Sequence, residues 1–172
     1  MFEKFRSDFR RHGGRATETG AWVMAVYRFG RWKEKLPKPA RWVAQKVYRL
    51  GFIGTNLTFG CHIPDTVEFG EAPHLVHAKD ILLHPRVKFG DRVGLMHNVT
   101  LATTMDRPGV PEVGDDVFIG TGAVVVGGVK IGDGARIAPN SLVLADVPAG
   151  ATAIGVPARI VRAPKLKAVP ES

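Results

Sequence analysis

A large aliphatic residue returns at every sixth position through much of the second half of the chain. These residues are Val113, Ile119, Val125, Ile131, Ile137 and Val143. Four positions after each stands a small or β-branched residue, namely Val117, Ala123, Val129, Ala135, Ser141 and Val147. Neither an α-helix nor an amphipathic strand has a period of six, whereas a parallel β-helix has it, because each unit is one short strand and one turn. The pattern predicts such a fold, with the aliphatic side chains inside the prism.

The same spacing continues upstream in two shorter series. The first contains Leu57, Ile63, Phe69, Leu75 and Ile81; the second contains Leu83, Phe89, Leu95 and Leu101. The phase changes by two residues near Ile81 and Leu83, which predicts a bulge or widened corner there. The segment 102–112 has Arg107 at an inward position and two prolines, so we expect it to leave the coil as a loop. At about 18 residues per turn, residues 52–154 would form roughly five to six coils.

The N-terminal part has a helical pattern instead. Apolar residues recur at helical spacing over 22–32 and again over 42–50, and LPKPA at 36–40 separates the two segments, which predicts two helices. Residues 1–50 carry 13 Lys and Arg against 4 Asp and Glu. We interpret them as an amphipathic cap over the open end of the solenoid; the basic charge leaves peripheral contact with an anionic membrane surface open. The aromatic residues are spaced for a buried helix face, so we expect no nucleic-acid partner.

Composition is consistent with one main domain. We expect a helical cap at 1–50, a β-helix at 51–162 and a tail at 163–172. No apolar run reaches the roughly 18 residues of a membrane span, and the N-terminus lacks the apolar stretch of a signal peptide. The single cysteine, Cys61, excludes an internal disulfide and is expected to be a buried structural thiol. We therefore expect a cytoplasmic protein, and we predict no metal site.

Several stretches resemble a known family. The closing GVPARIV at 155–161 and the run GCHIPDTVEFGEAPHLVHAKDILLHPRVKFGDRVGLMHNVTL at 60–101 are the most specific. Across residues 51–162 the chain resembles the hexapeptide-repeat acyltransferases, above all the serine acetyltransferases. The resemblance implies a left-handed β-helix that forms homotrimers, with acetyl-CoA as cosubstrate in the groove between neighbouring prisms. It also implies acetyl transfer to the hydroxyl group of a small-molecule acceptor.

Such a reaction requires a general base. A hydroxyl is a poor nucleophile at neutral pH, so a side chain must accept its proton, and a donor must stabilise the oxyanion. Histidine suits the first task. The candidates outside the helices are His62, His74, His77, His84 and His97, and His12 lies in the helical part. For each of them the alternative is a surface histidine hydrogen-bonded to a neighbouring turn.

Two of these histidines stand out. The resemblance places the family's catalytic histidine at His77, in the sequence LVHAKD. His77 and His97 each follow an inward aliphatic by two positions, so we expect both on one face of the prism, one coil apart. His62 stands where the family has an aspartate that orients the catalytic histidine.

The chain departs from the serine acetyltransferases at the acceptor side. The aspartate that grips the substrate's amino group corresponds to Val76, and a histidine at the end of the extruded loop corresponds to Val110. Without those groups an ammonium ion has no evident partner. Three interpretations stay open: serine-like acetylation, acetylation of a sugar or glycan-precursor hydroxyl, and a non-catalytic scaffold.

Coenzyme A binding follows from the same resemblance. The residues that match the family's groove are Thr103, Thr121, Gly122, Ala123 and Pro139. Thr121 and Pro139 are 18 residues apart, one coil, so they should stack. Basic residues after the last coil could meet the nucleotide phosphates or form a solvated tail; they are Arg159, Arg162, Lys165 and Lys167.

Overall fold

The computed structural model describes residues 2–14 and 17–162. Three helices come first: α1 (Phe2–Arg11), α2 (Thr19–Lys33) and α3 (Lys38–Phe59). Short strands follow: β1 (Glu68–Phe69), β2 (His74–Leu75), β3 (Leu82–Leu83), β4 (Lys88–Phe89), β5 (Gly94–Leu95), β6 (Thr100–Ala102), β7 (Glu112–Val113), β8 (Phe118–Ile119), β9 (Val124–Val126), β10 (Lys130–Ile131), β11 (Arg136–Ile137), β12 (Leu142–Val143), β13 (Ala151–Ile154) and β14 (Arg159–Arg162). The predicted tail at 163–172, with Lys165 and Lys167, lies outside the described residues.

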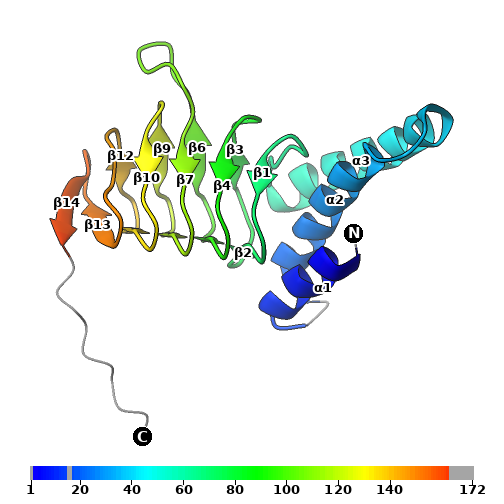
Figure 1. Cartoon of the computed structure of the whole chain (residues 1–172), viewed down its shortest axis with the longest axis horizontal. Coiled ribbons are helices and arrows are strands. Elements are labelled where there is room, and N and C mark those ends of the chain that lie inside the picture. The colour runs from blue at the N-terminus through cyan, green and yellow to red at the C-terminus, as the bar shows by residue number, and fades with distance from the viewer. Residues whose placement is uncertain (1, 15–16, 163–172) are drawn as a thin grey trace, which may run out of the picture.

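The strands form the three faces of a prism (Figure 1). One sheet has the order β1-β4-β7-β10, the second β14-β13-β11-β8-β5-β2 and the third β12-β9-β6-β3. Neighbouring strands are parallel except β13 and β14. The chain is therefore a parallel β-solenoid, as the period of six predicted. It has about four turns rather than the five to six expected, because a helix, an extruded loop and a bulge take residues from the coils.

The core follows the predicted inward positions. Ile119, Val125, Ile131 and Ile137 are all buried, which confirms the assignment over 113–147. Val113 pairs with Ile131 and Ile119 with Ile137, the 18-residue repeat of three strands per turn. The last repeat is shorter than the period of six predicts. The residue that pairs with Ile131 is Val147, which follows the inward Val143 by only four positions.

Two irregularities upstream were correctly predicted. Leu75 pairs with Leu95, whereas Leu83 pairs with Leu101, so the turn between β2 and β3 contains two additional residues. The chain between β6 and β7 leaves the prism as a loop, drawn protruding in Figure 1. Arg107 lies exposed in this loop.

The start of the solenoid was predicted wrongly. Leu57 was expected to point into the first coil, but it belongs to α3 and its side chain is 82% exposed. The helix continues past residue 51 and ends where Gly60 adopts a left-handed conformation, with φ of 65°, which glycine allows without steric cost. Cys61, the next residue, is buried as expected.

Helix α2 closes the open end of the prism. Val23, Met24 and Tyr27 belong to the same buried cluster as the prism interior. The Tyr27 hydroxyl donates a hydrogen bond of 2.8 Å to the carbonyl of Val67. The apolar face of α2 therefore replaces a further coil, which confirms a helical cap over this end.

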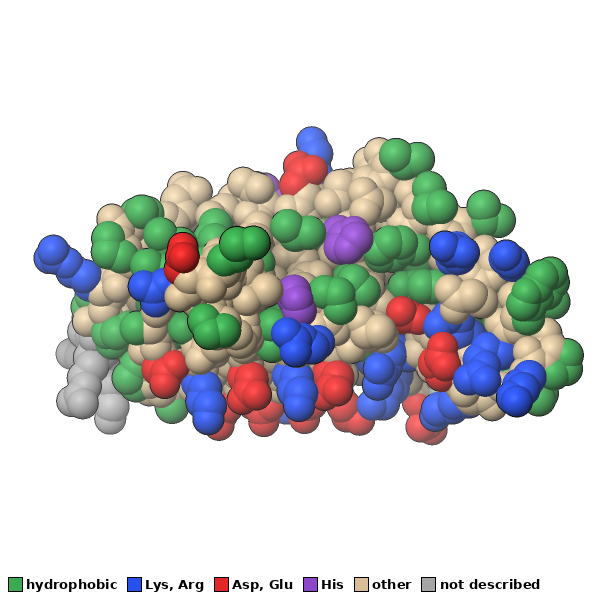
Figure 2. All heavy atoms as spheres, turned by 90° about the horizontal axis from the view of Figure 1, so that it is seen from above, with side chains coloured by type: hydrophobic (Ala, Val, Ile, Leu, Met, Phe, Trp, Pro, Cys, Tyr) green, Lys and Arg blue, Asp and Glu red, His purple; other side chains and the backbone are tan. Residues whose placement is uncertain are grey.

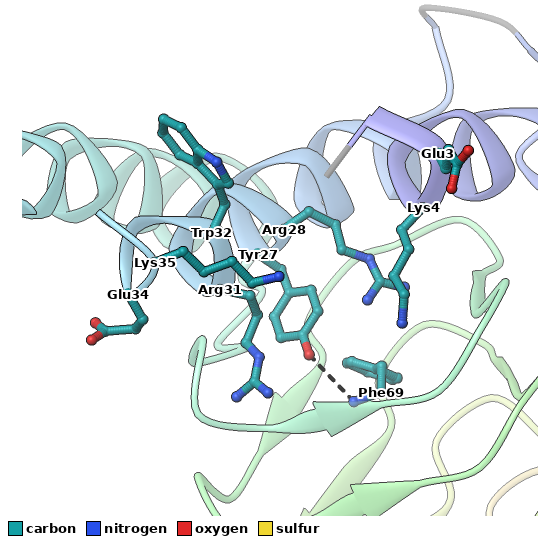
Figure 3. Close-up of a pocket in the computed structure, with 9 residues that line it drawn as sticks. All are labelled: Glu3, Lys4, Tyr27, Arg28, Arg31, Trp32, Glu34, Lys35 and Phe69. Carbon is teal, nitrogen blue, oxygen red and sulfur yellow. Dashed lines mark hydrogen bonds between the residues drawn. The ribbon is translucent and has the colours of Figure 1, made fainter. Parts of the chain in front are cut away.

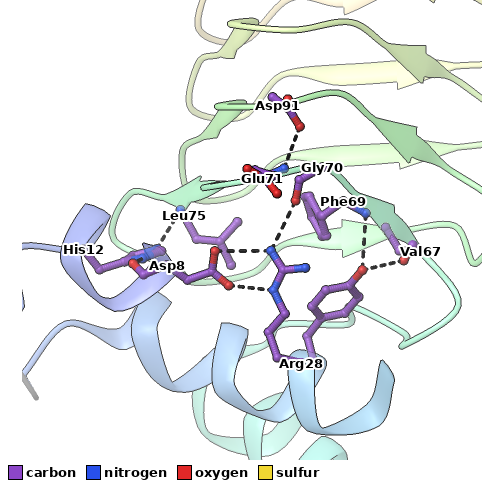
Figure 4. A network of polar contacts seen from close by, with 10 residues as sticks. Asp8, His12, Arg28, Val67, Phe69, Gly70, Glu71, Leu75 and Asp91 are labelled. Atoms are coloured by element: carbon purple, nitrogen blue, oxygen red, sulfur yellow. Dashed lines mark hydrogen bonds and ion pairs between the residues drawn. The ribbon is translucent and has the colours of Figure 1, made fainter. Parts of the chain in front are cut away.

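Helix α1, which the apolar pattern did not predict, is held by polar contacts (Figure 4). The Arg28 guanidinium donates two hydrogen bonds of 2.6 and 3.2 Å to Asp8, and both side chains are buried. His12 Nε2 accepts a 3.0 Å bond from the Leu75 N–H, and His12 Nδ1 lies 2.7 Å from the Asp8 carbonyl oxygen. The neutral tautomer with hydrogen on Nδ1 satisfies both contacts. These bonds connect α1 to α2 and to β2.

Exposed charges alternate along the first face. Glu68, Lys88, Glu112 and Lys130 lie opposite one another in register on β1, β4, β7 and β10, and such opposite-charge neighbours stabilise a sheet. Figure 2 shows acidic and basic side chains alternating along one edge of the molecule. No helix in the described part of the chain is both long and apolar enough to cross a membrane.

Candidate functional site

The turns after β2, β5, β8 and β11 stack along one edge of the prism. We call this edge the histidine corner; it consists of residues 76–81, 96–99, 120–123 and 138–141. His77 and His97 both lie on it, one coil apart, and so do Thr121, Gly122, Ala123 and Pro139. Six of the predicted site residues therefore meet at one edge.

His77 and His97 are nevertheless not in register. The N–H of Asn98 donates to the carbonyl of Lys79, and the N–H of Gly122 donates to that of His97. Lys79 is therefore the residue stacked on His97. His77 and Ala78 are the two additional residues of this turn, since the N–H of Val76 still bonds to Leu95. Ala78 is buried and anchors the insertion, whereas His77 is carried outward.

The backbone presents His77 to solvent. Its φ is 50°, in the left-handed region that few residues other than glycine and asparagine adopt. Its side chain is exposed, and its imidazole makes no hydrogen bond to any residue that the structure describes. A proton acceptor held at a turn with its ring nitrogens available is suited to general base catalysis.

His97 has a different environment. Its side chain is half-buried, and among the described residues its Nδ1 is the one buried side-chain nitrogen or oxygen without a hydrogen-bond partner. A buried polar atom left unpaired costs free energy, so such atoms commonly mark a site completed by a further group.

His62 is tied to the helical cap. Its Nδ1 lies 3.1 Å from the Asn56 side-chain nitrogen, and its ring packs edge-on against Phe52 at 5.1 Å. The His62 N–H donates a 2.7 Å bond to the carbonyl of Ile81, at the end of the insertion that carries His77. His62 therefore lies beside the histidine corner, but its imidazole is engaged by α3.

The two remaining solenoid histidines have local partners. His84 Nδ1 accepts a bond of 3.2 Å from the Arg86 N–H, the turn contact considered for any of these histidines. His74 packs edge-on against His12 with ring centroids 4.9 Å apart. Burial, and then the neighbouring His12 and Arg11, lower the pKa of His74 below its ordinary value.

The small residues of the corner give it shape. The Gly122 N–H donates to the His97 carbonyl on the neighbouring coil, and the Ala123 N–H donates to the Gly120 carbonyl of its own turn. The Ala123 side chain is buried. The Thr121 hydroxyl donates to Met96 Sδ at 3.4 Å. The Asn140 N–H donates to the Thr121 carbonyl, so the coils of Thr121 and Pro139 stack as expected.

The structure separates Thr103 and Arg159 from these residues. Thr103 follows β6 at the next corner, and its hydroxyl donates to the Arg107 carbonyl at 3.2 Å. Arg159 begins β14 and lies opposite Ile154 of β13. Within one chain the predicted residues therefore occupy the two edges of the sheet β12-β9-β6-β3 and, for Arg159, the β14 end of the six-stranded sheet. Among the described residues, no three His, Cys, Asp or Glu side chains are grouped so as to hold a metal ion.

One pocket lies elsewhere, between the helical cap and β1 (Figure 3). It has a volume of about 540 Å³ and is lined by Glu3, Lys4, Tyr27, Arg28, Arg31, Trp32, Glu34, Lys35 and Phe69. None of the predicted site residues lines it. The pocket and the histidine corner are therefore separate features of the chain.

Lys79, the residue in register with His97, was not among the predicted site residues. The phase change of two residues showed that the turn is longer, but the period alone does not reveal which residues are extruded. The left-handed column at the corner, formed by Asp80, Asn98, Gly122 and Asn140, was also not predicted. Three Asp or Asn residues at the same place in successive turns were the available signal, since these residues tolerate that conformation.

Comparisons with known proteins bear directly on this architecture. Residues 111–145 match the family model described as bacterial transferase hexapeptide, six repeats. The matched residues run from the start of the β7 coil to β12, within the solenoid. Such repeats match the left-handed β-helix, as the resemblance implied.

Several relatives and structural neighbours are serine acetyltransferases. Serine acetyltransferase of Helicobacter pylori is 34% identical over 104 residues, which are 59% of this chain and 61% of the relative. Serine acetyltransferase 4 of Arabidopsis thaliana is 35% identical over 105 residues, 60% of this chain and 30% of the relative. This hexapeptide-repeat chain thus matches less than two thirds of the length of these relatives.

Two solved structures extend the likeness to nearly the whole chain. Serine acetyltransferase from Brucella abortus in complex with coenzyme A superposes with a TM-score of 0.78 at 26% identity, covering 93% of this chain and 67% of that one. Soybean serine acetyltransferase complexed with serine also gives 0.78, at 27% identity, covering 92% of this chain and 68% of that one.

Proposed function

We propose that this protein is an acetyl-CoA-dependent O-acetyltransferase. The observation that supports it most is the histidine corner, where an exposed His77 and a partly unsatisfied His97 stand on successive coils of a hexapeptide-repeat prism. The likeness to a serine acetyltransferase in complex with coenzyme A adds the acyl donor.

In the proposed reaction His77 acts as the general base. Its free ring nitrogen accepts the proton of the acceptor hydroxyl while the oxygen attacks the thioester carbonyl carbon. The tetrahedral intermediate then collapses, the carbon–sulfur bond breaks, and the thiolate receives the proton from the His77 imidazolium. The products are the acetyl ester and coenzyme A. We assign His97, whose Nδ1 is buried and unpaired, to bond the acceptor or the reacting oxygen.

The corner fits an extended acyl carrier. Thr121 and Gly122 on one turn and Pro139 on the next offer short side chains, so an extended pantetheine arm can approach the backbone closely. Because the N–H groups of Gly122 and Ala123 already donate to backbone carbonyls, these two residues contribute shape more than hydrogen bonds. We assign Thr103 to the thioester end and Arg159 to the nucleotide phosphates, which guanidinium groups bind well. Lys167 has the same proposed role outside the described residues.

We further propose that the active assembly is a homotrimer. The residues assigned to the donor lie on two different corners of one chain, on either side of the sheet β12-β9-β6-β3. A groove that uses both is completed when a neighbouring prism brings the second corner to the first. Rotational symmetry would then give three identical sites.

The acceptor side favours a hydroxyl compound without an ammonium group, such as a sugar or glycan precursor. Val76 is half-buried, and Val110 packs against the core. Asp80 and Glu68 do not replace the missing charge within the chain: the Asp80 carboxylate lies against Gly60 at the end of α3, and Glu68 lies on another face beside Lys88. An ammonium group loses hydration on entering a site and needs a carboxylate in return.

Release of free thiol from acetyl-CoA, measured against amino acids, sugars and nucleotide sugars, tests the proposal. We expect turnover with a sugar-type hydroxyl and a kcat/KM for L-serine below about 10⁴ M⁻¹s⁻¹, the lower end for enzymes on their own substrates. A higher value for L-serine would restore serine acetylation as the activity. No release above background with any acceptor, from correctly folded protein, would favour the non-catalytic scaffold.

A further inference from the structure

Helix α3 is apolar on the face that points away from the protein. It packs on α2 through Ala44, Tyr48 and Thr55, which are buried. On the outward side Trp42 is 67%, Leu50 72% and Leu57 82% exposed. The other exposed apolar residues of the helix are Val43, Val47 and Ile53. We call these six residues the outer α3 face.

Their spacing makes the face continuous. Val43, Val47, Leu50 and Leu57 follow one another at intervals of four, three and seven residues, which places them on one stripe of a helix. Trp42 and Ile53 widen the stripe along one side. A helix on the surface of a soluble protein normally turns charged side chains outward, so an apolar stripe of this length indicates a binding surface.

The charge of α3 indicates what the surface binds. The helix contains Lys38, Arg41, Lys46 and Arg49 and no Asp or Glu. Lys46 lies over the Trp42 ring at 5.4 Å, so a cation accompanies the apolar stripe itself. A second copy of α3 would bring like charges together, whereas an anionic surface would neutralise them.

We infer that the outer α3 face docks on an anionic phospholipid membrane. The helix lies in the plane of the interface, with Leu50 and Leu57 at the boundary between headgroups and acyl chains. Lys38 and Arg49 meet the lipid phosphates, and Trp42 occupies the headgroup level where tryptophan is enriched. Arg41 pairs instead with Glu34, at the end of α2. This arrangement requires no membrane span, and it does not depend on the proposed acetyl transfer.

Vesicle sedimentation of the full chain tests the inference. Vesicles of phosphatidylcholine alone are compared with vesicles containing equal parts of phosphatidylcholine and phosphatidylglycerol. We expect at least about tenfold stronger partitioning to the anionic vesicles, weakened by high salt because exposed charges are screened. Equal partitioning to the two vesicle types would overturn the inference.

A pair of variants isolates the face. Leu50→Asp with Leu57→Asp should reduce binding to anionic vesicles by about tenfold or more. Met105→Asp with Ile154→Asp adds the same charge at exposed apolar positions away from α3 and should retain most of the binding. Equal loss in both double variants would contradict a role for α3.

Two further measurements distinguish membrane docking from misfolding of the variants and from binding of a second copy at the outer α3 face. With Trp22→Phe and Trp32→Phe, Trp42 is the remaining tryptophan, and its emission should shift to shorter wavelength with anionic vesicles. An unchanged emission would overturn the inference. A second result would also overturn it. If the protein forms an oligomer without lipid, and light scattering shows a lower mass for the variant Leu50→Asp with Leu57→Asp, the outer α3 face is covered by a second copy.

Discussion

At the scale of single residues, the histidine corner depends on the insertion of His77 and Ala78 in one turn. Ala78 points inward and is buried, and the neighbouring His77 is therefore held outward in a left-handed conformation. His97 on the next coil has no such insertion, and its Nδ1 is buried. Two histidines on successive coils of the same edge thus differ in environment: His77 is exposed, whereas His97 is half-buried.

Replacing His77 tests its role directly. We expect His77→Ala to lower kcat by about 10²–10⁴-fold, the contribution of a general base, and to leave the dissociation constant for acetyl-CoA nearly unchanged. Steady-state kinetics and calorimetric titration with acetyl-CoA measure the two effects. His97→Ala is the comparison: a severe loss there, with a mild one in His77→Ala, would move the general base to His97.

Acid should weaken the contact between α1 and the first coil. Burial, the neighbouring His12 and Arg11, and more weakly His77, lower the folded-state pKa of His74 below 6.5, while Glu18 acts in the opposite direction. Between the two pKa values the unfolded chain binds more protons, so this stabilisation is complete above about pH 6.5 and is lost as the pH falls. We expect the melting temperature to decrease from pH 7.5 to 5.5, and less steeply in His74→Gln. An identical slope in both proteins would contradict this assignment.

At the scale of elements, glycines allow close contact between the helices and the prism. A Cβ on Gly20 of α2 would press against the Leu75 carbonyl oxygen and the His12 ring, whereas a Cβ on Gly54 of α3 would have no atom within 4 Å. Both residues lie in helices, so alanine changes helix propensity at both positions. Only at Gly20 does the added Cβ also meet neighbouring atoms.

Alanine at these two positions should therefore have opposite effects. We expect Gly20→Ala to lower the free energy of unfolding by about 1–3 kcal/mol through overpacking. Gly54→Ala should raise it by about 1 kcal/mol through helix propensity. Urea denaturation followed by circular dichroism measures both. A stabilised Gly20→Ala protein would show that α2 does not pack tightly on the first coil.

The predictable elements were those whose side-chain environment repeats locally. The prediction of inward positions over 113–147 was correct because each coil packs on a coil with the same pattern of inward side chains. Leu57 was misassigned because it stands six residues before Ile63 and because the outer α3 face lacks the polar stripe that marks a surface helix. Helix α1 was missed although Phe2, Phe5 and Phe9 recur at helical intervals of three and four, because its contacts with α2 and β2 are made by the polar residues Asp8 and His12.

The candidate site was predictable only as far as the corner. Spacing placed His77 and His97 on the same edge, but the register of Lys79 with His97 depends on backbone hydrogen bonds across coils. The assigned roles of His77 and Thr103 came from resemblance, because no local pattern shows which corner a neighbouring prism would meet.

At the scale of the whole molecule, the proposed groove requires association. Light scattering at micromolar concentration should give three times the 18.6 kDa of one chain, because the two corners that carry His77 and Thr103 are joined only between prisms. A mass near 18.6 kDa would remove the proposed site geometry together with the trimer.

Each end of the prism is closed by a segment that cannot extend it. A parallel solenoid leaves unpaired backbone groups on its terminal coils, and another solenoid could add to them as a further coil. At one end α2 covers the first coil; at the other, β14 runs antiparallel to β13, with Arg159 opposite Ile154. An incoming chain would meet a strand of reversed direction on that face. The reversal therefore makes this sheet a poor template for a further parallel coil, which opposes growth of the prism along its axis on that face.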